Sequence, residues 1–330
     1  MKYLYVLVYS DANFYIEQTY VSMLSLRQVT PKAYISLLVD DKTAKKQDCS
    51  FLNFIKDFVD EFKVVSLDES MPAIAKSRFL KTNMRQYIEG DFLYVDSDTI
   101  WASSINEKDF TFDLMGVLDG HCRLKDHPAL SYIQSLFKKT NCFPQTEYYL
   151  NGGVLYSKDS AFSHDFFSKW HDCWMESSKR GCFVDQPTLN MLLSKESSLE
   201  KFFLPGIYNA QIAFSWDYFF EAKIIHFFNS VVEQFAKYRN PYILKNSSFW
   251  ENFSKNGFNE NISHIIDNPL TAFEPGFSII SEDDKNFRKT KTYGLFEDIY
   301  RKKINGEKSK FDLIEKMLGI YISIVNKIGK

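Results

Sequence analysis

The stretch that most constrains this chain is FLYVDSDTIW, residues 92–101. An apolar, strand-like run leads directly into two carboxylates, Asp96 and Asp98, which are separated by Ser97. Side chains two positions apart in an extended chain point the same way, so both carboxylates can face one cation. Such hard oxygen ligands suit magnesium or manganese, which keep positions open for phosphate oxygens. Paired acids at a strand end are also common as loop solvation or as a helix cap, so the motif gains weight only from its surroundings.

The residues before this stretch alternate between two periodicities. Strand-like runs fall at residues 2–9, 33–39, 63–67 and 91–95, and helical spacing falls at residues 15–28, 51–62 and 73–88. This alternation predicts a parallel sheet with crossover helices. Ligands of such sheets bind beyond the carboxyl ends of the strands. The candidate positions are therefore residues 10–13, 40–41 and 96–98.

The pattern after residue 101 indicates a mixed region. Strands are expected at residues 113–118, 150–157 and 224–228, and helices at residues 128–139 and 160–178, with a further helix starting at Asp185. Pro187 would lie in the first turn of that helix, where proline is tolerated. The pattern becomes looser beyond about residue 229, and residues 308–330 form an amphipathic tail.

Composition limits the classes of function. The chain has 330 residues, of which 17% are aromatic. Its net charge is −2, so no overall positive charge argues for a nucleic-acid partner. The aromatic residues are expected mostly in the core, although aromatic faces also stack on sugar rings. The five cysteines form no CxxC pair, which favours a reducing cytosol over a disulfide framework or a zinc site. The first residues lack a signal-peptide pattern and no run is long enough to span a membrane, so we expect a protein kept inside the cell.

Four further motifs follow the DxD. They are LNGGVL at residues 150–155, DQPTLN at residues 185–190, LPGIYN at residues 204–209 and IIHF at residues 224–227. The glycines of the first motif permit close approach of the backbone to a ligand. A histidine inside an apolar strand is more often a hydrogen-bonded core residue, but the DxD makes His226 a candidate third metal ligand.

The order and spacing of these motifs resemble glycosyltransferase family 8, the retaining nucleotide-sugar enzymes of GT-A fold, over about residues 2–228. The resemblance implies an α/β fold of that type: a Rossmann-like mixed sheet flanked by helices, with a C-terminal helical appendage. It also implies a Mn²⁺ (or Mg²⁺) cofactor held by Asp96, Asp98 and His226, which bridges the diphosphate of a UDP-sugar donor. The catalytic domain would span residues 1–230, with a nucleotide-sugar half at about 1–100 and an acceptor half at about 101–230. Residues 231–330 would form an extension.

The resemblance also implies roles for single residues. Asp11 and Asn13 are similar to the turn that contacts uridine, with Phe14 or Tyr15 near the base. Arg78 is similar to an arginine that contacts the donor sugar and phosphate, and a solvated helix charge is the alternative. Asn151 and Gly152 would touch the donor sugar, and Asp185 and Gln186 would lie by the transferred sugar, with Gln186 where a nucleophile might be expected. Ser97 would lie at the nucleotide sugar with the two aspartates. The catalytic set is therefore Gln186, Asp185 and Asn151.

One departure from the family concerns the segment after the histidine. Family members often continue with Gly and a Lys-Pro-Trp set that closes over the diphosphate, whereas this chain has no lysine between His226 and Lys237. Diphosphate contact from this loop is therefore in doubt.

The expected partners include a glycan, lipid-linked or protein-linked sugar acceptor, in surface polysaccharide or glycoconjugate assembly as in many bacterial relatives. The tail, with lysines at its edges, would lie on an anionic membrane surface from the cytoplasmic side, or else dock on its own domain or on a second copy in a homo-oligomer.

Two other functions fit parts of the sequence. A haloacid dehalogenase-like phosphatase also places an aspartate after a strand, but that motif usually starts the domain, whereas about 90 residues of βα pattern precede Asp96. A protein of the same fold could instead bind a nucleotide sugar or glycan without turnover. Intact Asp96, Asp98, Gln186 and His226 argue for an enzyme.

Overall fold

A computed structural model describes residues 1–10, 13–46, 49–228 and 240–328. The chain forms two compact units, Met1–Pro275 and Gly276–Lys330. None of the helices described is both long and apolar enough to cross a membrane.

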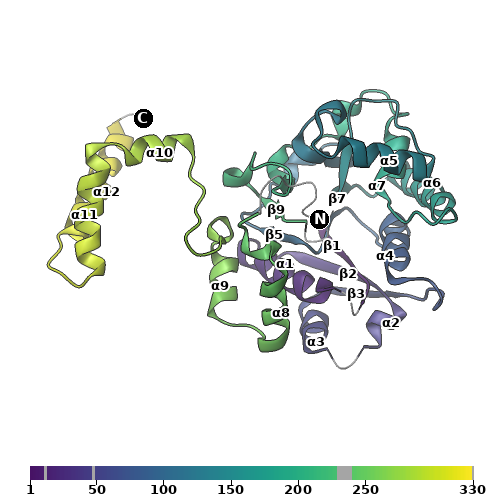
Figure 1. Cartoon of the computed structure of the whole chain (residues 1–330), viewed down its shortest axis with the longest axis horizontal. Coiled ribbons are helices and arrows are strands. Elements are labelled where there is room, and N and C mark those ends of the chain that lie inside the picture. Colours follow the sequence, from purple (N-terminus) through teal and green to yellow (C-terminus); the bar gives the residue numbers. More distant parts are fainter. Residues whose placement is uncertain (11–12, 47–48, 229–239, 329–330) are drawn as a thin grey trace. The chain divides into compact units, whose positions relative to one another are not determined.

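A six-stranded mixed sheet forms the centre of the first unit (Figure 1). Its order is β3-β2-β1-β4-β7-β6. The strands are β1 (Lys2–Leu7), β2 (Tyr34–Asp40), β3 (Glu61–Val65), β4 (Phe92–Val95), β6 (Leu114–Leu118) and β7 (Leu150–Ser157). The first four are mutually parallel, and β7 runs antiparallel to both β4 and β6. The predicted α/β class, with a mixed sheet flanked by helices, is confirmed.

Alternate side chains of β1 point to two different cores. Tyr3, Tyr5 and Leu7 belong to a core that includes residues of α1 (Tyr15–Val29) and α3 (Ser50–Phe58). Leu4 and Val6 belong to a second core on the opposite face, with residues of α4 (Ala73–Thr82), α6 (Ala161–Ser178) and α7 (Gln186–Leu193). Because both faces are covered, every residue of β7 is buried, which explains its continuous strand-like run.

A second, three-stranded sheet lies against α1. It has the order β5-β9-β8, with β5 (Thr99–Trp101) antiparallel to β9 (Ile224–His226) and β8 (Ala210–Gln211) parallel to it. Trp101 and Ile225 are fully buried in the same core as α1. This sheet joins the end of the DxD motif to the distant IIHF motif.

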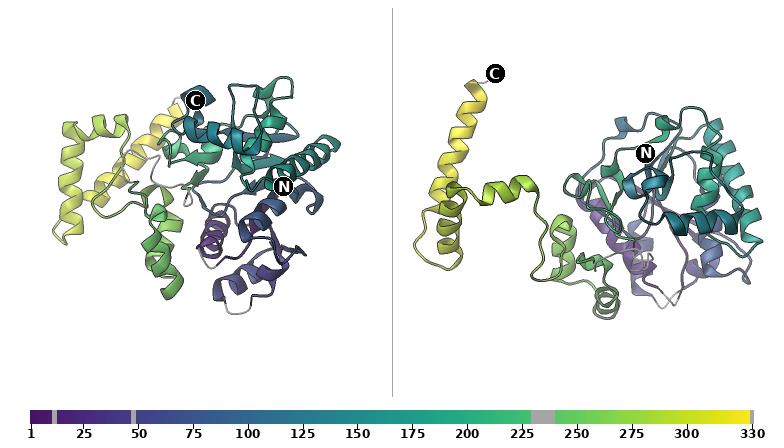
Figure 2. Two further views of the ribbon diagram at one scale, coloured as in Figure 1. Left: turned by 45° about the vertical axis from the view of Figure 1, so that its right-hand side comes forward. Right: turned by 45° about the horizontal axis from the view of Figure 1, so that its top comes forward.

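Two helices after residue 230 belong to the first unit. Helices α8 (Ser247–Asn256) and α9 (Glu260–Asp267) both contact α1, and they lie beside it in both views of Figure 2. Trp250 and Phe253 of α8 are buried in the core of α1 and α3. The compact unit therefore continues to Pro275, beyond the boundary at residue 230 that the sequence predicts for the catalytic domain.

The second unit consists of α10 (Glu282–Arg288), α11 (Lys291–Ile304) and α12 (Phe311–Ile328). Helix α12 occupies the predicted amphipathic tail. Residues 241–304, where the sequence pattern is loose, contain four α-helices, α8 to α11. The sequence indicated a helical appendage here but did not predict where these helices lie.

Several predicted boundaries were wrong. The helix expected over residues 51–62 ends at Phe58, and Phe62 lies in β3, because the chain turns at Val59 and Asp60 to enter the sheet. The helix expected over residues 73–88 ends at Thr82 and is followed by a 3₁₀ turn at Met84–Gln86. Helix α5 (Leu130–Thr140) begins two residues later than expected.

Candidate functional site

A pocket of about 310 Å³ opens beyond the carboxyl ends of β1 and β4. Val6, Leu7 and Val8 line it from the first strand, and Tyr94 and Asp96 from the fourth. These two strands are neighbours in the sheet although α1 and two further strands separate them in the chain. This is the position at which open α/β sheets bind ligands.

The three predicted metal ligands lie together in this pocket. One ligand atom from each of Asp96, Asp98 and His226 lies within 4.8 Å of the other two. The ladder between β5 and β9 pairs Thr99 with His226, so Asp98, which precedes β5, lies next to the imidazole. His226 Nε2 and Asp98 Oδ1 are 3.2 Å apart. Adjacent ligands of an octahedral ion with bonds of about 2.1 Å lie about 3 Å apart, so the His226–Asp98 pair has the spacing of two ligands of one ion, and a small movement of the side chains would bring all three groups to it.

Gly153 leaves the space in which the ligands meet. A β-carbon on this residue would lie 2.3 Å from His226 Cε1 and 2.8 Å from Asp96 Oδ2. No real side chain tolerates such contacts, so the site requires glycine here. Backbone pairing fixes the arrangement, because the Asp96 N–H donates to the Gly153 carbonyl at 2.8 Å. A β-carbon on Gly152, the glycine named from the sequence, would meet nothing closer than 3.6 Å.

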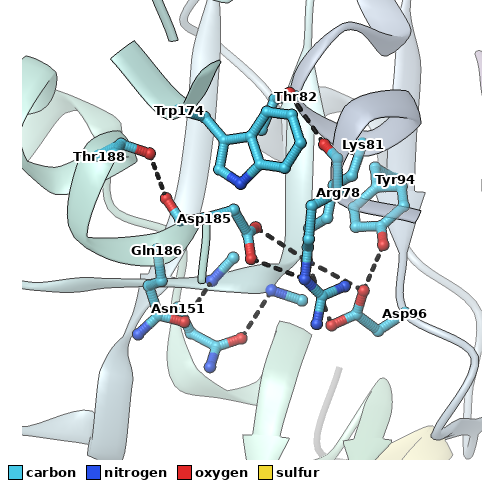
Figure 3. A network of polar contacts seen from close by, with 12 residues as sticks. Arg78, Lys81, Thr82, Tyr94, Asp96, Asn151, Trp174, Asp185, Gln186 and Thr188 are labelled. Carbon is cyan, nitrogen blue, oxygen red and sulfur yellow. Dashed lines mark hydrogen bonds and ion pairs between the residues drawn. The ribbon is translucent and has the colours of Figure 1, made fainter. Parts of the chain in front are cut away.

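Two cationic side chains of α4 face two carboxylates, those of Asp96 and Asp185 (Figure 3). Arg78 Nε lies 3.0 Å from Asp185 Oδ1. Lys81 Nζ lies 3.1 Å from Asp96 Oδ1 and 3.5 Å from Asp185 Oδ2, with its side chain only 4% exposed. The Tyr94 hydroxyl donates a hydrogen bond to Asp96 Oδ1. Arg78 thus contacts protein as well as the pocket, and Lys81 is a site residue that the sequence did not reveal.

The electrostatics of this cluster favour charged Asp185. Burial raises the pKa of its carboxyl group, but Lys81 and Arg78 outweigh burial and hold the pKa below its ordinary value. Asp185 is therefore an anion at neutral pH, and Trp170 and Thr188 hold its backbone carbonyl by hydrogen bonds. Burial and the charge of Asp96 raise the pKa of Tyr94 well above its ordinary value, so Tyr94 remains a neutral donor.

Gln186 and Asn151 line the pocket on the side opposite α4. Gln186 Oε1 accepts a hydrogen bond from the Gly152 N–H at 3.2 Å, which ties the start of α7 to β7. The Asn151 side chain contacts Asp119, Asn209 and the Gly153 backbone. Asp185, Gln186, Asn151 and Gly152 thus lie close together, and their contacts with a donor sugar stay predictions.

Only some of the predicted nucleotide-contacting residues line the pocket. Tyr15 and Ser97 line the pocket, and Thr19 of α1 donates a hydrogen bond to Ser97 at 2.8 Å. Asn13 Oδ1 accepts a hydrogen bond from the Tyr15 N–H at 3.3 Å, and Asn13 is not among the lining residues. Asp11 lies outside the described residues, as does the segment 229–239 that replaces the Lys-Pro-Trp set.

A second, more apolar cavity of about 140 Å³ adjoins the first. Tyr132, Asn151, Gln186 and Phe228, together with Val184, line both cavities. The second cavity continues along α5 (Ile133, Leu136) to a polar end formed by Asp119 and His127, whose Oδ2 and Nε2 atoms are 3.2 Å apart. The two cavities therefore share one wall.

Among solved structures, several glycosyltransferases are similar to this chain in fold. No protein-family model matches the chain, and no curated protein matches it at a significant level. A galactosyltransferase, LgtC, in complex with donor and acceptor sugar analogues is 15% identical, with a TM-score of 0.47, over 79% of this chain and 98% of that one. The apo form of mouse xyloside xylosyltransferase 1 is 14% identical, with a TM-score of 0.43, over 70% of this chain and 99% of that one. An active-site mutant of LgtC is also similar, at 14% identity and a TM-score of 0.42.

Proposed function

We propose that this protein is a metal-dependent glycosyltransferase that moves a hexose from a UDP-sugar to a glycan or lipid-linked acceptor. One observation carries the proposal: Asp96 and Asp98 of the DxD motif and His226 of the distant β9 meet in one pocket, around a glycine that leaves room for an ion. The five motifs that resemble glycosyltransferase family 8 contribute residues to the same region, which supports a member of that family with retention of configuration.

A bound Mn²⁺ or Mg²⁺ would neutralise the donor's diphosphate and stabilise it as the leaving group. The chain's own residues would bind and orient the sugar. Asp185, kept anionic by Arg78 and Lys81, places negative charge where positive charge develops on the anomeric carbon. Gln186 and Asn151 offer amide groups to the sugar from the opposite side, with Gln186 facing both cavities. The acceptor hydroxyl would lose its proton to a leaving phosphate oxygen.

The second cavity supports an acceptor site beside the donor. Apolar and aromatic walls from Tyr132, Tyr149 and Phe214 suit the face of a sugar ring, and Asp119 with His127 can hydrogen-bond to its hydroxyls. Both cavities share Gln186, so a bound acceptor would lie next to the transferred sugar. The proposal extends to assembly of a surface glycan at the cytoplasmic face of a membrane, with α12 as the membrane contact.

A donor screen tests the proposed function. Purified protein is incubated with Mn²⁺ and each common nucleotide sugar, and free nucleoside diphosphate is measured. We expect release from one UDP-sugar, and loss of nearly all turnover in Asp98→Ala with an unchanged circular dichroism spectrum. Binding of a nucleotide sugar without release from any donor would support a non-catalytic binding protein instead. Full turnover in Asp98→Ala would contradict the metal assignment.

A further inference from the structure

A line of buried polar side chains leads away from His226 into the protein. His226 Nδ1 lies 3.0 Å from Asn209 Oδ1, and Asn209 Nδ2 lies 3.0 Å from Asn151 Oδ1. Asn151 Nδ2 lies 2.8 Å from Asp119 Oδ1. None of these four residues is more than 5% exposed. Burial at this level means that each polar atom depends on its partner within the line.

Donor and acceptor identities can be assigned from the far end of this line. The Gly153 backbone N–H can only donate, and it points at Asn151 Oδ1 at 2.8 Å. The Asp119 carboxylate accepts from Asn151 Nδ2, so the Asn151 amide has one possible orientation. Its oxygen must then also accept from Asn209 Nδ2, which leaves Asn209 Oδ1 as the atom facing the imidazole. An amide oxygen accepts, so His226 Nδ1 is the donor and carries a proton.

With Nδ1 as the donor, Nε2 is the ring atom that faces Asp98 Oδ1, at 3.2 Å. A lone pair on Nε2 and the carboxylate oxygen would repel each other at this distance unless a proton or a metal cation lies between them. The same arrangement is what a metal requires, because a ligating histidine usually donates its other ring N–H to a fixed acceptor. Phe228 holds the plane of the ring, since its own ring stacks on His226 with centroids 3.8 Å apart and an angle of 7°.

We propose that Asn209 and Asn151 are positioning residues of the metal centre, which fix the tautomer and direction of His226 through two successive amides. The inference deepens the proposed function, because it rests on the metal role of His226. Asn209 belongs to the LPGIYN segment, and the line explains why an asparagine is required there. Asn151 uses both lone pairs of its oxygen and one N–H in this line, and its second N–H is left for the pocket.

NMR of the wild-type protein can show which ring nitrogen of His226 carries the proton. The chain has six histidines, so ¹⁵N-histidine labelling gives few signals, and the pair from His226 is identified by its loss in His226→Gln. In the metal-free protein we expect a long-range ¹H–¹⁵N pattern that shows a proton on Nδ1. A pattern with a proton on Nε2 and none on Nδ1 would overturn the inference, because Asn209 would then not be setting the proton.

Metal affinity gives the second test. Asn209→Leu keeps the side-chain volume and removes the acceptor, so the Mn²⁺ dissociation constant, from the EPR signal of free Mn²⁺, should rise by roughly 10–100-fold. Gln211→Leu is the matched control, because this fully buried amide of β8 bonds to the Gly120 N–H and the Leu118 carbonyl and not to His226. It should lose comparable stability and keep its Mn²⁺ affinity.

The results of these tests distinguish a failure of this inference from a failure of the proposed function. Unchanged Mn²⁺ affinity in Asn209→Leu would refute the inference while leaving the donor screen free to succeed. Tight Mn²⁺ binding that depends on Asn209, combined with no diphosphate release from any donor, would uphold the inference and refute the proposed enzyme.

Discussion

Gly153 is the residue whose substitution tests the metal pocket most locally. A methyl group there would overlap His226 and Asp96, whereas one on Gly152 would make ordinary contacts. We predict that Gly153→Ala weakens Mn²⁺ binding at least about tenfold, since small displacements of ligands cost this much at metal sites. Gly152→Ala should retain the wild-type affinity. Titration of both variants with Mn²⁺ decides the point, and equal affinities would show that the ion does not lie beside Gly153.

Asp185 is a residue whose charge should stabilise the fold. Its pKa in the folded protein lies below the ordinary value, so its contribution is fully present above about pH 4 and is lost as the pH falls through the folded pKa. Asp185→Asn leaves Arg78 and Lys81 without this partner, which should cost about 3 kcal/mol at pH 7. The difference in unfolding free energy from wild type, measured in urea, should shrink below pH 4. A difference that is constant between pH 7 and pH 3 would exclude an electrostatic cause.

The three proposed metal ligands could be picked out from sequence, whereas their neighbours could not. Asp96 and Asp98 come after an apolar run and His226 lies within one, which is a local pattern. Lys81 and Asn209 act through contacts with residues far away in the chain. Asn209 lies in the LPGIYN motif, but the motif does not show that its side chain contacts His226. Lys81 does lie one helical turn after Arg78, and that spacing was the available signal.

Among the strands and helices, the length of each one determined whether it could be predicted from sequence. The strands β1, β2, β4 and β7 are long or strongly apolar, and the alternation of strands with helices indicated a mostly parallel sheet. Strands β5 and β8 have only three and two residues, too few for a periodicity. Helices α8 and α9 are short, and polar residues make up their exposed faces, mostly serine and asparagine in α8, so they were missed although their buried faces carry Trp250, Phe253 and Ile262.

Helix α8 gives a prediction about the domain boundary. Trp250 is fully buried, its ring lies 6.0 Å from that of Phe227, and its indole N–H donates to the Leu244 carbonyl. Trp250→Ala should therefore destabilise the first unit by about 3–5 kcal/mol. Phe258→Ala, at a side chain that is 53% exposed, should change stability by less than about 0.5 kcal/mol. Urea unfolding followed by circular dichroism measures both, and a small effect at Trp250 would place the boundary near residue 230.

The chain combines a first unit, residues 1–275, with a second unit, residues 276–330, of opposite net charge. Residues 276–330 contain 12 Lys and Arg against 8 Asp and Glu, whereas the entire chain carries a net charge of −2. Helix α12 exposes Leu313, Met317, Ile320 and Ile324 along one side. Apolar side chains at this spacing with flanking lysines are typical of helices that lie on anionic membranes.

Vesicle binding tests this arrangement. We predict that the full chain sediments with vesicles containing phosphatidylglycerol, and that Ile320→Glu reduces the partition about tenfold, because an isoleucine contributes about 1.5–3 kcal/mol when buried. Ser323→Glu adds the same charge on the polar side of α12 and should have a smaller effect. No binding by the wild-type chain, with a dimer in gel filtration, would assign the apolar side to a second copy.

The central claim is that one divalent ion is held by two aspartates and a histidine beside the donor's diphosphate. Its most direct test is Mn²⁺ titration of the wild-type chain with and without UDP, followed by EPR, with Asp98→Ala and His226→Ala alongside. The account predicts one ion per chain, bound more tightly when UDP is present, and a loss of affinity of at least about tenfold in each variant. Equal affinity in all three proteins, or binding that UDP does not affect, would contradict it.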